Sequence, residues 1–170
     1  MTGGSDAAKK VNASLARVAA KNSVAMASGS LSAALRDETL LSTFSVIRSE
    51  NPHGFVMANV SAGTSASDAL RAVNMIHANA LQVHLNAAQE LVMQEGDRDF
   101  RNWLCNIESI VSACEALSVP VIVKETGCGI SAKDVHRLKD VGVRTVDVSG
   151  RGGTNFVTIE TVSYTHLTLP

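Results

Sequence analysis

The stretch ALQVHLNAAQE at residues 80–90 decides the fold, because a largely apolar run ends there in a cluster of polar side chains. In parallel α/β folds, the groups that act on a ligand lie at the carboxyl ends of the strands, while the strand bodies stay apolar. Side chains alternate along a strand, so we expect His84 and Asn86 to point the same way. Gln89 and Glu90 are expected on a loop just beyond them.

The same succession of apolar strand, polar turn and amphipathic helix recurs along the chain. The predicted strands cover residues 24–27, 54–60, 80–86, 120–126 and 145–149, and the predicted helices cover 5–21, 33–36, 65–78, 102–117 and 131–139. Val11, Leu15 and Val18 recur at helical spacing in the first helix. Ser5 and Ser131 are placed to cap the first and last of these helices. Serial units of this kind predict a parallel sheet with helices outside it.

This pattern fits either an open, doubly wound sheet or a (β/α)8 TIM barrel. Nearly every strand ends in a polar or glycine-rich loop, which favours the barrel, because an open sheet concentrates its site at one switch point. A complete barrel takes about 250 residues, so the 170 residues predict a partial barrel of roughly five to six βα units. We expect one incomplete barrel domain over residues 1–160. Residues 161–170 resemble translated adapter sequence and are expected to be a non-native tail rather than the next helix.

Composition narrows the class of protein. A net charge of −1 does not indicate the basic surface that binds nucleic acid. No apolar run approaches the roughly 20 residues of a membrane helix. Three cysteines without CxxC spacing argue against a disulfide framework or a zinc site and favour a reducing compartment. Cys105 and Cys114 are expected to be buried thiols on a helix. No signal peptide is expected, because the chain opens on a turn-like segment.

Several residues can carry chemistry, and each has more than one interpretation. Lys124, inside an apolar strand, either pairs with Glu125 or another neighbour, or projects a fixed charge into the site, and the cost of burying an unpaired ammonium favours the site. Glu90 is a metal ligand, a general base or a solvated carboxylate, and its place beside an amide suits magnesium. The glycine-rich segments at 2–4, 127–129 and 150–154 either approach an anion or form tight βα turns.

Together the motifs resemble one known family. They are MTGG at 1–4, the Gly29-Ser30 turn, Asn59, HxNxxQE at 84–90, the charged EGDR at 95–98, VKExGxGIS at 123–131 and DxSGxGGTN at 147–155. In this order they resemble the FMN-dependent type 2 isopentenyl-diphosphate delta-isomerases, from Met1 to about Glu160. The resemblance implies a (β/α)8 barrel that binds FMN and Mg²⁺ and converts isopentenyl diphosphate to dimethylallyl diphosphate, with NADPH keeping the flavin reduced.

The resemblance also implies roles for individual residues. The implied flavin contacts are Met1, Thr2, Gly3, Ser30, Asn59, Lys124, Ser149 and Thr154. The implied substrate contacts are Ser30, Leu31, Ser32, His84, Asn86 and Gln89. Glu90 would hold magnesium. His84 and Gln89 are the implied catalytic side chains, with Gln89 orienting the substrate and reduced flavin as the acid and base. Ser32 stands where many relatives carry arginine.

The resemblance further implies a homo-oligomer, a tetramer or octamer. The cysteine usage favours the cytoplasm, and the charge and hydropathy argue against a nucleic-acid or membrane partner. Two parts of the family pattern are expected outside this chain: an arginine-lysine pair before the first motif and later glycine-rich loops that bind the flavin phosphate. Two alternatives stay open. One is another FMN-dependent barrel, such as a 2-hydroxy-acid oxidase relative, and the other is a non-catalytic, phosphate-binding fragment.

Overall fold

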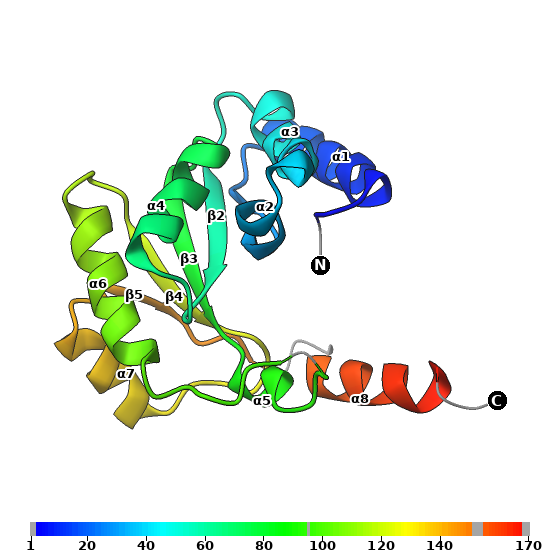
Figure 1. The fold of residues 1–170 in the computed structure, drawn as a ribbon. Coiled ribbons are helices and arrows are strands. Elements are labelled where there is room, and N and C mark those ends of the chain that lie inside the picture. Colours follow the sequence, from blue (N-terminus) through cyan, green and yellow to red (C-terminus); the bar gives the residue numbers. More distant parts are fainter. Residues whose placement is uncertain (1–2, 95, 151–154, 168–170) are drawn as a thin grey trace.

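A five-stranded parallel sheet forms the centre of the chain, with its strands in sequential order (Figure 1). The computed structural model describes residues 3–94, 96–150 and 155–167, with side chains described up to Val162. The strands are β1 (Met26–Ala27), β2 (Val56–Ser61), β3 (Ala80–Leu85), β4 (Val121–Glu125) and β5 (Thr145–Asp147). Each strand pairs with the next in parallel, so all carboxyl ends meet at one edge of the sheet.

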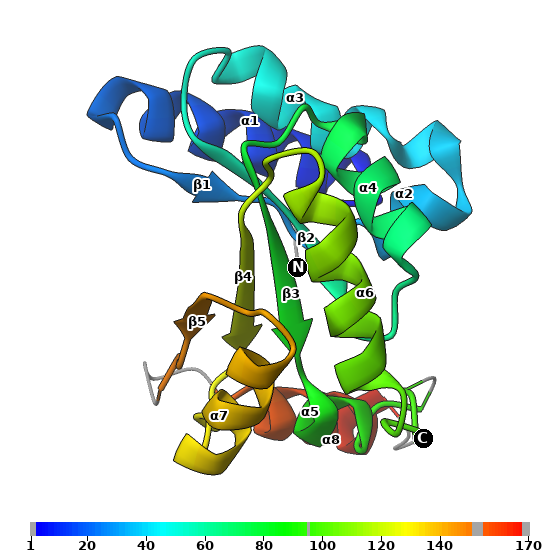
Figure 2. The ribbon, with the colours of Figure 1, turned by 90° about the vertical axis from the view of Figure 1, so that its left-hand side faces the viewer.

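Helices precede, connect and follow the strands. They are α1 (Asp6–Asn22), α2 (Ser32–Arg36), the 3-10 turn η1 (Glu38–Leu40), α3 (Ser42–Glu50), α4 (Ala66–Met75), α5 (Ala87–Glu90), α6 (Trp103–Glu115), α7 (Ala132–Asp140) and α8 (Phe156–Leu167). Helices α4 and α6 pack side by side against the central strands and cover one face of the sheet, whereas α5 and α8 lie at the carboxyl edge (Figure 2). None of the described helices is long and apolar enough to cross a membrane.

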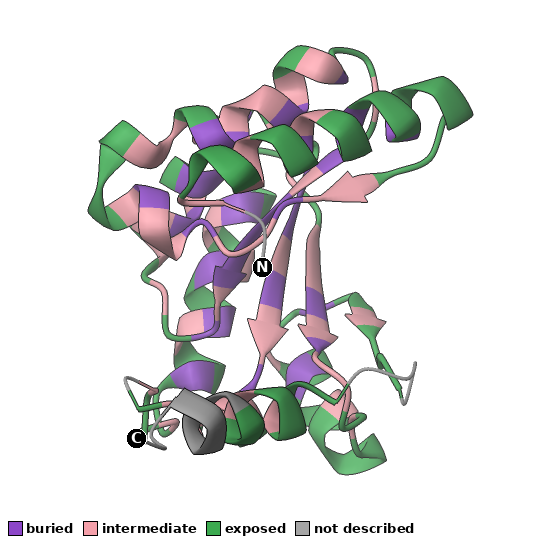
Figure 3. Cartoon of the chain, turned by 90° about the vertical axis from the view of Figure 1, so that its right-hand side faces the viewer, coloured by how far each residue is buried: buried purple, intermediate pink, exposed green. Residues whose placement is uncertain are grey.

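The hydrophobic core lies between the sheet and its helices. Ala58 and Val60 of β2 are fully buried, as are Leu81 and Val83 of β3. The register places Ala58 beside Leu81 and Val60 beside Val83, so one continuous apolar face meets α4 and α6. The intervening residues of these strands point to the opposite face. Figure 3 shows that the helices leave this opposite face of β3 and β4 uncovered.

A single arginine fixes the amino-terminal edge of the sheet. Arg48 of α3 donates through Nη1 to the carbonyls of residues 51, 52 and 54, and through Nη2 to the carbonyl of His77 and Oδ1 of Asn79. These acceptors belong to the loops that lead into β2 and β3. Arg48 therefore sets the start of both strands, and with it the register at which their carboxyl ends meet.

The five predicted strands and the five predicted helices are confirmed, with shifts of a few residues at their ends. Both predicted caps are also confirmed, because Ser5 Oγ accepts from the amide of Ala8 and Ser131 Oγ accepts from the amide of Asp134. Helix α3 was not predicted. Its short, mixed sequence follows directly on η1 and carries no side-chain cap, so no start signal marks it.

Three expectations need correction. The prediction that residues 161–170 do not continue as a helix is wrong as far as Leu167, because α8 extends to that residue. Cys105 is exposed rather than buried, whereas Cys114 on the core-facing side of α6 is buried as expected. The loop expected at Gln89 and Glu90 is the one-turn helix α5.

Candidate active site

The carboxyl edge of the sheet carries a row of polar side chains on its uncovered face. The register aligns Ser61, His84, Lys124 and Asp147 as neighbours across β2, β3, β4 and β5. Apolar strand bodies with polar groups at the carboxyl edge are the arrangement in which parallel α/β enzymes keep their chemistry. We call these four residues the polar row.

His84 is the most strongly perturbed group of the polar row. Its Nδ1 lies 2.8 Å from Oδ1 of Asn59. Burial and, after it, the charge of Lys124 lower the pKa of His84 from 6.5 to about 4, while Glu90 opposes them weakly. The imidazole is therefore neutral at physiological pH. A perturbed histidine beside a fixed cation on an open face is typical of a ligand-binding or catalytic site.

Asn86 and Glu90 are held together by α5. Asn86 begins this helix, is 7% exposed and donates from Nδ2 to Oε1 of Glu90 at 2.5 Å. The other carboxylate oxygen, Oε2, accepts from the amide of Asp97 at 2.8 Å. Because β3 ends at Leu85, Asn86 no longer follows the strand alternation that predicted a common direction with His84. The helical turn instead fixes Asn86 against Glu90.

Gln89 is held by a contact with helix α8 at the carboxyl edge. Its Nε2 donates to Oε1 of Glu160 on α8 at 2.9 Å. This contact joins the end of the predicted barrel segment to the HxNxxQE motif, 71 residues earlier in the chain. The oxygen of the Gln89 amide keeps its capacity to orient a hydrogen-bond donor.

The charged segment after α5 is a folded loop. Arg98 donates through Nη1 to the carbonyls of Glu90, Gly96 and Asp97, and through Nη2 to the carbonyl of Met93. A Cβ on Gly96 would collide with the carbonyl oxygen of Glu90, so this position requires glycine. For this segment the structure favours a role in holding Glu90 in place.

Lys124 projects from β4 on the uncovered face, as the sequence favours. Its Nζ donates to the backbone carbonyl of Glu125 at 2.7 Å. The lysine therefore does not pair with the Glu125 carboxylate, which is engaged in the turn after β4. One ammonium donor is used by this contact, and the others are available to a ligand of the polar row.

The Glu125 carboxylate fills the glycine turn that follows β4. Its Oε2 accepts from the amides of Gly127, Cys128 and Gly129 at 2.6, 2.6 and 2.9 Å. Burial raises the pKa of Glu125, but the backbone hydrogen bonds outweigh it and leave the pKa below its usual value. Of the two interpretations of segment 127–129, the tight βα turn is the one observed, because the carboxylate already takes the amides an external anion would need.

The turn after β1 lies at the same edge. Ser30 and Ser32 are joined through their hydroxyls at 2.9 Å, and the amide of Leu31 donates to the carbonyl of Asn59. Leu31 is fully buried in the core, so in this structure it presents no surface to a ligand. Neither serine carries a charge, so these two side chains form a neutral hydrogen-bonding surface.

Of the remaining predicted flavin contacts, the structure describes Gly3 and Ser149. Met1, Thr2 and Thr154 lie outside the described residues. Gly3 packs against the ring of Phe44, and a Cβ there would overlap the ring carbons, so packing alone requires glycine. Ser149 follows β5, is exposed and donates its amide to Oδ1 of Asp147.

The sequence analysis gave no role to three polar residues of the open face, which are Ser61, Gln82 and Asp147. Gln82 of β3 lies next to Asn59 of β2 and accepts from its Nδ2 at 3.3 Å, and Asp147 ends the polar row on β5. Strand alternation carries the signal for Gln82, because a polar residue two positions before His84 shares its face. For Asp147 the signal is its place at the end of a predicted strand.

No group of three or more histidine, cysteine, aspartate or glutamate side chains gathers to hold a metal within the described ranges. A magnesium ion at Glu90 would therefore have to draw most of its oxygen ligands from other groups, from water and from substrate.

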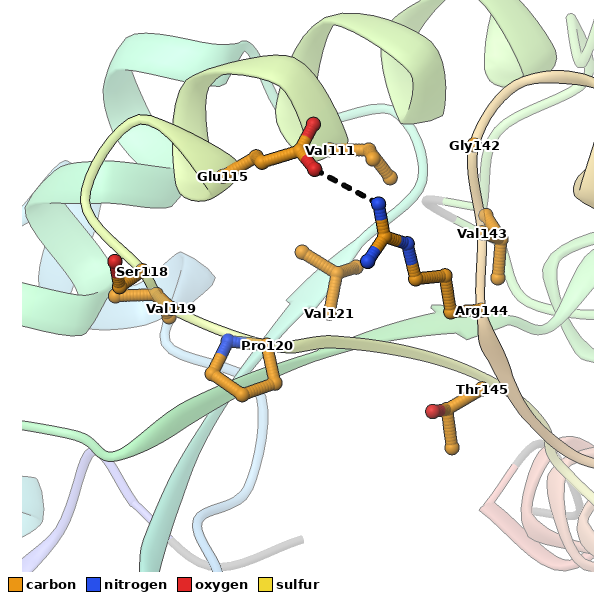
Figure 4. A pocket seen from close by; sticks show the side chains of 10 residues that line it. All are labelled: Val111, Glu115, Ser118, Val119, Pro120, Val121, Gly142, Val143, Arg144 and Thr145. Carbon is orange, nitrogen blue, oxygen red and sulfur yellow. Dashed lines mark hydrogen bonds and ion pairs between the residues drawn. The ribbon is translucent and has the colours of Figure 1, made fainter.

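A pocket lies at the opposite edge of the sheet. A cavity of about 380 Å³ opens at the amino ends of β4 and β5, where Glu115 and Arg144 form an ion pair of 3.0 Å at its rim (Figure 4). Both side chains are largely exposed, and the walls are mostly apolar. No residue of the polar row lines this cavity, because the row lies on a face that the described helices leave uncovered.

Comparison with known proteins agrees with the motifs. Over 160 residues, or 94% of the chain, it is 52% identical to a protein of Listeria welshimeri, 57% to one of Latilactobacillus sakei and 52% to one of Staphylococcus epidermidis. Each of the three is named isopentenyl-diphosphate delta-isomerase. The chain is similar to these isomerases over almost its whole length. It spans 44–45% of the length of these isomerases.

No family model matches the chain. Solved structures resemble it weakly, among them a mandelate racemase/muconate lactonizing enzyme from Roseiflexus sp., at 15% identity and a TM-score of 0.38 over 89% of this chain and 54% of that one.

Proposed function

We propose that the chain is the central part of an FMN-dependent isopentenyl-diphosphate delta-isomerase, which converts isopentenyl diphosphate to dimethylallyl diphosphate. The observation that carries the proposal is the polar row at the carboxyl edge, in a chain 52–57% identical to proteins of that name. The motifs that resemble the type 2 family include His84 and Lys124 of this row. The FMN-dependent type is the form of the enzyme that we infer from them.

We infer further that the sheet is part of a (β/α)8 barrel. The sequential order of the five strands has no reversal, whereas a doubly wound sheet reverses at its switch point. Helices α4 and α6 lie on the face away from the polar row, as the outer helices of a barrel do (Figure 2). The sheet edges at β1 and β5 have no neighbouring strand among the described residues, so further strands could extend the sheet at both edges.

The donors near Glu90 fit magnesium. Its carboxylate lies beside Asn86, whose Oδ1 is buried and without a hydrogen-bond partner in the described part of the chain. Carboxylate and amide oxygens are ligands that Mg²⁺ accepts, with water and phosphate oxygens completing its octahedron. Glu90 would therefore hold the ion against the substrate diphosphate, and the loop tied by Arg98 would keep Glu90 in position.

The uncovered face also fits an anionic reduced flavin. Lys124 supplies a fixed positive charge on this face, and Ser30 supplies a hydroxyl at the same edge. FMN, when bound and kept reduced by NADPH, supplies the proton donor and acceptor for the allylic shift. The glycine turn at 127–129 would not bind its phosphate, because the Glu125 carboxylate occupies the turn.

The chain's own residues would bind and orient the substrate. His84 and Asn86 lie at the end of β3 and Gln89 on the turn beyond it, so they surround the place where the diphosphate would meet Glu90. Gln89 does not titrate, which limits it to orienting the substrate. Ser30 and Ser32 would add neutral hydrogen bonds. We also propose a cytoplasmic enzyme that assembles as a tetramer or octamer.

Activity can be tested by transplanting the matched segment. The 160 matched residues of the Latilactobacillus sakei isomerase would be replaced by their counterparts from this chain, and the chimera assayed anaerobically with reduced FMN, Mg²⁺ and isopentenyl diphosphate. We expect dimethylallyl diphosphate to form only when both flavin and metal are present. A folded chimera that binds FMN without turnover would overturn the proposal.

A pair of matched variants tests the metal site. In the chimera, Glu90→Gln should raise the Mg²⁺ concentration needed for half-maximal activity by at least about tenfold. Glu115→Gln removes a carboxylate at the opposite edge and should leave this concentration unchanged. Equal metal dependence of the two variants would remove Glu90 from the magnesium site.

A further inference from the structure

The side-chain amides of Asn59 and Gln82 form a chain of hydrogen bonds that ends at the imidazole of His84. Oδ1 of Asn59 lies 2.8 Å from Nδ1 of His84, and Nδ2 of Asn59 donates to Oε1 of Gln82 at 3.3 Å. Asn59 is 8% exposed. Both hydrogen-bonding ends of its side chain are therefore engaged with neighbours on the sheet, with the oxygen toward His84 and the nitrogen toward Gln82.

The orientation of the Asn59 amide determines which ring nitrogen of His84 carries the proton. Because the nitrogen end of the Asn59 amide donates to Gln82, its oxygen end faces His84 and can only accept. Nδ1 of a neutral His84 must then be the protonated nitrogen. Nε2 is left as a bare acceptor.

The charges around His84 favour the same tautomer. Lys124 is the direct neighbour of His84 on β4, and its ammonium depresses the imidazole pKa. A lone pair on Nε2 is attracted to a nearby ammonium, whereas an Nε2–H would be repelled by it. Glu90, the other charged group acting on His84, has the smallest effect of the three causes.

We propose that Asn59 is a positioning residue, which fixes His84 in the Nδ1–H tautomer so that Nε2 faces the site as a hydrogen-bond acceptor. This inference rests on the proposed function and changes the expected roles of two residues. Asn59 acts through His84 rather than by binding the flavin with its side chain. A neutral His84 has no donor left for a phosphate oxygen, so it accepts from a donor group such as the Lys124 ammonium or an N–H or O–H of the bound ligand.

The tautomer can be measured directly in the full chain. With ¹⁵N-labelled histidine, the protonated and bare ring nitrogens of His84 have well-separated NMR shifts, and His84→Gln assigns the signals. We expect Nδ1 protonated in the wild type. Asn59→Leu keeps the side-chain size but removes the acceptor, so it should give a mixture of tautomers. Asn59→Asp, which can only accept, should restore the Nδ1–H form.

Flavin affinity separates positioning from direct contact. In the chimeric isomerase, Asn59→Leu should lower kcat/KM at least about fivefold while the Kd for FMN stays unchanged, and Asn59→Asp should recover part of the loss. A protonated Nε2 in the wild type, or an unchanged tautomer in Asn59→Leu, would overturn the inference. A loss of FMN affinity with the tautomer intact would do the same. Absence of isomerase activity in the unmutated chimera would refute the proposed function alone, because the NMR result does not depend on turnover.

Discussion

The buried imidazole of His84 should make folding depend on pH. Its pKa is lowered from 6.5 to about 4, first by burial and then by Lys124. The unfolded chain therefore binds a proton that the folded chain rejects, so stability falls as pH decreases from about 6.5 and levels off below about 4. At about 1.4 kcal/mol per pH unit, this depression corresponds to at most about 3 kcal/mol, because partial exposure of the ring screens part of the effect.

Urea unfolding at several pH values between about 4 and 7.5 would measure this contribution. The wild type should lose stability over this range more steeply than His84→Gln, whose side chain does not titrate. The other histidines and the carboxylates contribute equally to both slopes, so the difference between the slopes isolates the contribution of His84. An NMR titration of the His84 ring gives the folded-state pKa independently. Parallel slopes, or a His84 ring that titrates near its ordinary value, would refute the reasoning.

Three further predictions concern the scaffold of the site. Glu125→Ala leaves three turn amides without an acceptor, so we expect a loss of about 2 kcal/mol and faster hydrogen exchange at 127–129, measured by NMR. Arg48→Met removes the donor to five acceptors in two loops and should cost about 2–3 kcal/mol in urea unfolding, and a loss below about 0.5 kcal/mol would contradict its role. Gly3→Ala should destabilise the chain by clashing with Phe44, and Phe44→Leu should relieve part of that clash in the double variant, as a thermodynamic cycle would show.

The strands were predictable because each one carries its own signal. In residues 80–85, the positions that face the helices are apolar. The polar residues of this strand, Gln82 and His84, lie at the alternate positions, which face the open side. Residues 145–147 form the shortest strand after β1, yet the run before Ser149 was enough to predict it. Local sequence also predicted the caps at Ser5 and Ser131, because an N-cap bond spans three residues.

The contacts that organise the site were not predictable in the same way. Asn59 and His84 are 25 residues apart, and Gln89 and Glu160 are 71 residues apart. Their pairing depends on strand register and on how α8 approaches α5, neither of which leaves a pattern in a local window. The role of Glu125 was equally hidden. A carboxylate before a glycine turn fits a ligand, an ion pair or a turn anchor, and only the three amide contacts decide.

Helix α1 shows where periodicity stops being informative. The spacing of Val11, Leu15 and Val18 predicted the helix correctly, but these residues are 48%, 49% and 57% exposed. The buried face instead carries Asn12, Ala16 and Ala19, which pack toward α3. Alanines let two helices approach closely, and Asn12 adds a hydrogen bond to the carbonyl of Thr43 in α3. A hydrophobic stripe thus predicts that a helix forms, whereas the face it buries depends on which partner surface lies within reach.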